Sequence, residues 1–123
     1  MFHVPEDQFA DLIDQSFDTL PAAHRKAVQN VAIVYADEPT PNQREQLQLA
    51  CNETLYGLYE GVPLARRQGV TGYPPDKITI FKGPMQADAT SLADLRTKIH
   101  HTLWHEIAHY FGLNHAQIHK LEN

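Results

Sequence analysis

Residues 91–112 read SLADLRTKIHHTLWHEIAHYFG, and this stretch has the clearest structural pattern in the chain. Ser91 followed by Asp94 is typical of a helix start, because a hydroxyl and a carboxylate can satisfy the free amide groups there. An apolar pattern then continues to Phe111, and Gly112 is a natural left-handed stop. About twenty residues at ~1.5 Å each make a helix about 30 Å long. We therefore expect this helix to be the central packing element.

The two sides of this predicted helix differ in character. His105 and His109 project from one side, about 40° apart and one turn along. Two neighbouring imidazoles favour a metal ion over hydrophobic packing. The opposite side is an apolar stripe that should bury against a sheet, formed by Leu92, Leu95, Ile99, Leu103, Ile107 and Tyr110.

Residues 105–115 read HEIAHYFGLNH, which is the pattern HExxHxxGxxH. Histidines four residues apart on a helix can reach one ion at about 2.0–2.1 Å. The glycine lets the chain leave the helix sharply, which brings His115 back to the same ion. We therefore predict one zinc ion bound by His105, His109 and His115, with a fourth position open for water.

Glu106 follows the first histidine, about 100° around the helix. Its carboxylate can reach a water on the metal, and zinc lowers the pKa of such a water to roughly 7. Glu106 can then take the proton as general base and pass it to a leaving amine. The motif therefore predicts peptide-bond hydrolysis with Glu106 as the catalytic residue.

Other residues near the motif have alternative roles. His119 competes for the place of the third ligand if the C-terminal segment is helical. His101, four residues before His105, is a side chain that supports the metal site, a substrate contact or a solvated side chain. Tyr73 and Tyr110 are candidates to assist an oxyanion, although Tyr110 fits the core better. Cobalt, nickel and copper ions also bind three imidazoles, so the donor set alone does not fix the metal.

The composition excludes several classes of protein. The 123 residues are too few for two separate cores, and a single cysteine, Cys51, excludes a disulfide framework. No apolar run approaches the roughly 18 residues of a membrane span. A net charge of −5 and a pI of about 5.8 argue against nucleic acid as a partner. The acidic first residues are unlike a signal peptide, so we expect a cytoplasmic protein.

The remaining sequence predicts further helices and short strands from its periodicity and its breakers. In chain order, these are a helix over 6–19, a short helix over 22–30, a strand over 31–36, a helix or loop over 42–54, a strand interrupted by glycines over 55–67 and a strand over 77–83.

The motif resembles the extended zinc motif of the metzincin clan of metallopeptidases. Metzincins have a methionine in a turn downstream of the third histidine, whereas Met1 and Met85 both lie upstream. Only eight residues follow His115. We therefore expect neither that turn nor the C-terminal subdomain that walls the metzincin cleft.

The chain resembles more closely, over nearly its whole length, the small bacterial zincin-like family, also called MMP-like. The strings that carry this resemblance are LYGLYEGVPL (55–64), PPDKITIF (74–81) and TLWHEIAHYFGLNH (102–115). The resemblance implies one minimal zincin-like domain over residues 1–123, of α+β class, with N-terminal helices and a small mixed sheet packed against the motif helix. It also implies a zinc metallopeptidase that acts on a peptide or protein. Members often have an acidic residue where His115 stands.

The strand KITIF comes just before the motif helix, as does the edge strand that zincins lay alongside their substrate. An exposed edge holds an extended peptide by main-chain hydrogen bonds. This makes Ile78, Thr79, Ile80 and Phe81 candidate substrate contacts, together with His101. An interior strand is an equally good interpretation of the same residues.

Two functions are consistent with these features. The first is a minimal zinc-dependent peptidase. The alternative is a weak or inactive zinc-binding module that acts through a protein partner, because a shortened cleft would orient a substrate poorly. Neither nucleic acid nor a membrane is expected as a partner, and the sequence does not specify an oligomeric state.

Overall fold

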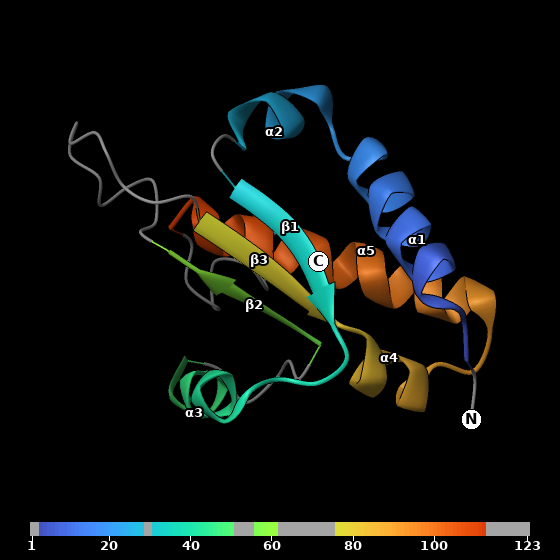
Figure 1. Ribbon diagram of the computed structural model, residues 1–123. Helices are drawn as coiled ribbons and strands as arrows, with labels where there is room; N and C mark the ends of the chain where they lie inside the picture. The colour runs from blue at the N-terminus through green and yellow to red at the C-terminus, as the bar shows by residue number, and fades with distance from the viewer. Residues whose placement is uncertain (1–2, 29–30, 51–55, 62–75, 113–123) are drawn as a thin grey trace.

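The computed structural model describes residues 3–28, 31–50, 56–61 and 76–112. It confirms a mixed α+β fold with a small sheet and a long C-terminal helix (Figure 1). The elements are α1 (Glu6–Asp18), α2 (Ala22–Ala27), β1 (Val31–Ala36), α3 (Pro41–Ala50), β2 (Gly57–Glu60), β3 (Asp76–Phe81), α4 (Lys82–Asp88) and α5 (Leu92–Tyr110).

Helix α5 begins and ends where the sequence predicts. The Ser91 hydroxyl accepts a hydrogen bond from the Asp94 main-chain N–H at 3.0 Å. The Asp94 carboxylate accepts one from the Thr90 N–H at 2.9 Å, one residue earlier than in a standard capping box. Gly112 has a φ of 87°, which is the left-handed conformation expected for it.

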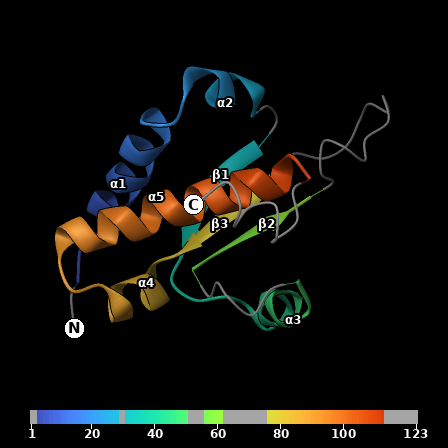
Figure 2. The same cartoon turned by 180° about the vertical axis from the view of Figure 1, so that it is seen from behind.

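The apolar stripe of α5 forms the core together with α1 and one face of the sheet. Figures 1 and 2 show α1 and α5 side by side over this face. The α5 side chains Leu95, Ile99, Leu103 and Ile107 are fully buried, which confirms the predicted stripe. They share one cluster with Phe9, Leu12 and Ile13 of α1 and with Ile78 and Ile80 of β3.

The sheet has the order β1-β3-β2, with β3 parallel to β1 and antiparallel to β2. The strand containing KITIF is therefore central, and the prediction of an edge strand there is wrong. Both main-chain sides of β3 are used by neighbouring strands, so no peptide can add to them. The candidate substrate contacts on this strand are at most 3% exposed: Ile78, Thr79, Ile80 and Phe81.

Of the two alternatives for residues 42–54, the structure has the helix, α3. The described part of the interrupted strand is β2, Gly57–Glu60, and residues 62–67 lie outside the described ranges. Helix α4 was not predicted, since Gly83 and Pro84 are typical of a turn. Proline is nevertheless accepted in the first turn of a helix, where its missing N–H has no partner to lose. Among the helices of the described ranges, none is both long enough and apolar enough to cross a bilayer.

Candidate functional site

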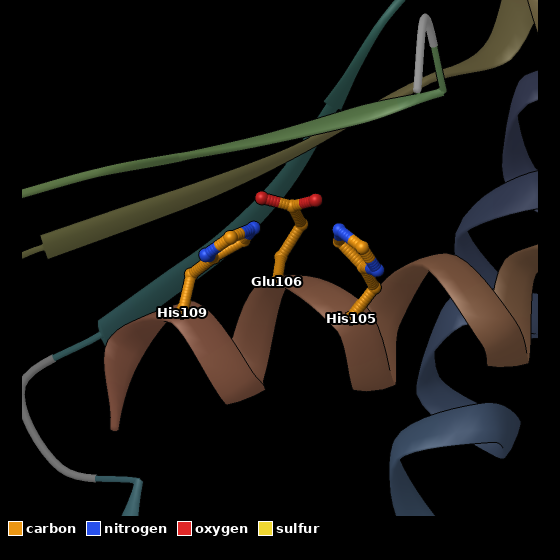
Figure 3. Close-up of side chains that lie close together, drawn as sticks. All are labelled: His105, Glu106 and His109. Atoms are coloured by element: carbon orange, nitrogen blue, oxygen red, sulfur yellow. The ribbon is translucent and has the colours of Figure 1, made fainter. Parts of the chain in front are cut away.

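Three side chains of the predicted motif converge on one side of α5. The ring centroids of His105 and His109 are 4.9 Å apart, with their planes at 74°. The ligand atoms of His105, Glu106 and His109 all lie within 4.8 Å of one another. Figure 3 shows the three side chains pointing the same way, with the carboxylate between the two rings. The spacing in the sequence therefore produces the expected neighbourhood.

This side of α5 is covered, and Glu106 projects beside the apolar stripe. His105 is 2% and Glu106 3% exposed, and His109 is half-buried. The three side chains point toward the strands (Figure 3), and α5 contacts both β2 and β3. The sequence predicts the direction of the side chains, but the strand that covers them is a long-range contact.

Strand β2 approaches α5 closely because residue 57 is glycine. A Cβ at Gly57 would stand 2.6 Å from Thr102 Cγ2 and 3.4 Å from Glu106 Cγ. The first distance is shorter than real Cβ atoms show, so a larger residue would move the strand or the helix. This role of Gly57 was not predicted, although an isolated glycine inside a strand pattern often marks a close backbone approach.

The main chain of β2 holds the Glu106 carboxylate. The Tyr59 N–H donates to Glu106 Oε1 at 2.9 Å. Along an antiparallel pair, the main-chain groups of successive residues alternately face the partner strand and face away from it. The Phe81 N–H donates to the Tyr56 carbonyl at 2.7 Å, so Tyr56 faces β3. The N–H of Tyr59, three residues later, therefore faces away from β3. The Tyr59 hydroxyl donates to Asp76 Oδ2 at 2.5 Å. Tyr59 therefore fixes Glu106 while its own ring is anchored elsewhere.

Burial controls the protonation of this carboxylate. Desolvation raises the pKa of Glu106 from its usual 4.5 to about 7, and the hydrogen bond from Tyr59 offsets part of the rise. Glu106 therefore exchanges its proton near neutral pH, which suits a group that must both accept and donate one.

The other predicted site residues have different outcomes. His101 is exposed, and its ring stacks beside that of His105, with 6.5 Å between centroids. Tyr110 is 1% exposed and belongs to the core. His24 is half-buried and stacks on Trp104 at 5.5 Å, although its sequence context is that of a surface residue. The predictions for Cys51, Tyr73, His115 and His119 lie outside the described residues.

The donor set fits a zinc ion. Imidazole nitrogens and carboxylate oxygens are ligands that zinc binds at about 2.0–2.2 Å. His105 and His109 present such nitrogens from successive turns of one rigid helix, and neither needs a loop to bring it into place. The described residues therefore supply two ligands and one adjacent carboxylate.

Most of the chain matches a known protein family. The family model for zincin-like metallopeptidases matches residues 28–123. This range contains the sheet, α3, α4 and the whole of α5, whereas α1 and α2 precede it. No curated protein matches the chain.

Proposed function

Since the chain belongs to the family of zincin-like metallopeptidases, we propose that it is a zinc-dependent peptidase with Glu106 as its general base. The observation that carries this proposal is the convergence of His105, Glu106 and His109, whose ligand atoms lie within 4.8 Å of one another. A structural zinc site does not require a carboxylate beside its histidines, whereas a hydrolytic site does.

His105 and His109 would hold the zinc ion, with His115 as the third ligand and His119 as its competitor. A bound zinc ion supplies Lewis acidity toward the substrate carbonyl and lowers the pKa of a water molecule. Three protein ligands leave a position for that water. Of the two described ligands, His105 is buried and His109 half-buried, which limits access of bulk solvent to the site.

Glu106 would take the proton of the attacking water and deliver it to the leaving nitrogen. The Tyr59 N–H occupies Oε1, so this proton transfer falls to Oε2. Tyr59 is a positioning residue in this scheme, because it acts only through Glu106. The strand beside the site is β2, so we place the main chain of the peptide substrate along β2 and no longer along β3.

The first test compares cleavage of a quenched fluorescent peptide library by the wild type, Glu106→Gln and Glu45→Gln. Glu45 is an exposed carboxylate on α3 and serves as the matched control. Loss of the general base should lower kcat by about 10²–10⁴ without loss of zinc. Equal chelator-sensitive cleavage by wild type and Glu106→Gln, with zinc in both, would overturn the assignment.

The second test measures bound zinc by mass spectrometry in the His105→Ala, His109→Ala, His115→Ala and His119→Ala variants. His3→Ala, at an exposed histidine, is the control. We expect loss of zinc from the first three variants and retention in the other two. Full zinc occupancy in His105→Ala would contradict the site. The alternative of an inactive module predicts normal zinc binding with no cleavage of any library member.

A further inference from the structure

A groove of about 550 Å³ lies between α1 and the N-terminal half of α5. Trp104 on α5 is the aromatic side chain of its lining, and it is half-buried, so it presents a fixed surface. Leu12 on α1 also lines the groove but is only 3% exposed. The groove is more than twice the volume of the hollow between α1 and β1, which is about 250 Å³.

The polar lining of the groove favours negative charge. Arg96, His100 and His101 line it, and no carboxylate does. This contrasts with a net charge of −5 for the chain and with the acidic residues of α1, none of which is part of the lining. The Nδ1 atom of His100 lies 3.2 Å from the hydroxyl oxygens of both Ser16 and Thr19. These two contacts fix the orientation of the ring.

The groove borders the candidate metal site at His101, whereas Glu106 projects from the other flank of α5. Side chains four residues apart form rows along a helix surface. Arg96, His100 and Trp104 form one such row. The neighbouring row starts with Thr97 and His101 in the groove, and it continues as His105 and His109. The rings of His101 and His105 stack at 6.5 Å, so the groove ends about one helical turn, ~5.4 Å along the axis, from the site.

From this juxtaposition we propose that the groove between α1 and α5 binds an acidic stretch of the peptide substrate. The apolar side chains of this peptide contact Trp104, and its carboxylates pair with Arg96 and His100. A guanidinium can bind a carboxylate through two hydrogen bonds, which adds direction to the attraction. The proposal rests on the proposed peptidase function, because a peptide bound in the groove is a substrate only if the metal site cleaves that peptide.

The binding test uses the chain's single tryptophan, which lies in the groove. The full chain, both zinc-loaded and chelator-treated, is titrated with a blocked peptide of alternating glutamate and leucine and with its glutamine counterpart. We expect Trp104 emission to change with the glutamate peptide and the glutamine peptide to bind about fivefold more weakly. Calorimetry on the same samples measures the binding if the emission does not respond. Equal affinity for the two peptides, or no binding of either, would overturn the proposal.

The variant test compares Arg96→Gln with Arg44→Gln. Both arginines are exposed and both changes remove one positive charge, but Arg44 lies on α3. Arg96→Gln should remove most of the fivefold difference in affinity between the glutamate and glutamine peptides. Arg44→Gln should leave that difference unchanged. An equal loss in both variants would mean that net charge, not the groove, attracts the peptide.

Cleavage kinetics separate this proposal from the proposed function. If zinc-loaded protein cleaves the glutamate peptide, Arg96→Gln should raise its KM about fivefold and leave kcat unchanged. Carboxylate-selective binding without any cleavage would support the groove and count against the peptidase. Cleavage of both peptides with one KM would support the peptidase and reject the groove.

Discussion

Helix α5 has two buried faces with opposite chemical character. The apolar face is fully buried and the site face is at most 3% exposed at His105 and Glu106, so burial does not distinguish them. Burial of aliphatic groups stabilises the fold. Burial of an ionised carboxylate opposes it. One helix thus combines a face that contributes stability with a face that costs stability. The apolar face consists of Leu95, Ile99, Leu103 and Ile107.

Leu103→Ala tests the apolar face and should have the largest effect. Leu103 is fully buried in the cluster shared by α1, α5 and the sheet. Its truncation should lower the free energy of unfolding by about 2–5 kcal/mol, because it removes apolar contacts and leaves a cavity. Urea unfolding followed by circular dichroism measures the change. Thr97→Ala, at an exposed position of α5, should stay within about 0.5 kcal/mol of the wild type.

Glu106→Gln tests the site face, and the expected effect has the opposite sign. In metal-free protein, the carboxyl has a pKa of about 7 when folded and about 4.5 when unfolded. The unfolded state therefore loses its proton first as the pH rises from 4.5 to 7, and wild-type stability falls across this window. The variant should be more stable than the wild type by about 3 kcal/mol at pH 8 and by less than about 1 kcal/mol at pH 5.

Urea unfolding of chelator-treated protein at both pH values measures this difference. Glu45→Gln removes an exposed carboxyl from α3 and should match the wild type at both. A Glu106→Gln variant that is less stable than the wild type at pH 8 would mean that the site face does not cost stability. The contrast between the two faces would then be lost.

Gly57→Ala tests the contact between the site face and β2. The new Cβ would stand 2.6 Å from Thr102 Cγ2, and we expect a loss of about 1–3 kcal/mol from overpacking. Thr102→Ser removes that methyl group, so it should recover part of the loss in the double variant. A coupling of about 0.5 kcal/mol or more in the double-mutant cycle would measure this relief. Strictly additive effects would show that the two residues do not restrict each other.

Local signals were sufficient to predict α5 and its caps. Ser91 and Gly112 act on neighbouring backbone groups, and the apolar stripe depends only on helical periodicity. The same holds for the side-by-side placement of His105 and His109. The order of the strands was not predictable in this way, because pairing of β3 with both β1 and β2 joins residues far apart in the chain. The position of KITIF at the centre of the sheet follows from that pairing.

The candidate site was likewise predictable only where it depends on local sequence signals. The direction of Glu106 followed from its place in the motif, but its hydrogen bond to Tyr59 links residues 47 positions apart. The raised pKa of Glu106 follows from burial under a strand that the sequence did not place there. Helix α4 was missed for a different reason, since Gly83 and Pro84 are tolerated near a helix start but resemble a turn.

The position of the two histidines along α5 has an electrostatic consequence. The aligned peptide dipoles of a helix place partial positive charge at its first turn and partial negative charge at its last. Asp94 lies in the first turn of α5 and His109 in the last. A cation held by His105 and His109 therefore lies at the negative end of the helix, which favours it by about 0.3–1 kcal/mol. The helix that positions the ligands also attracts the ion.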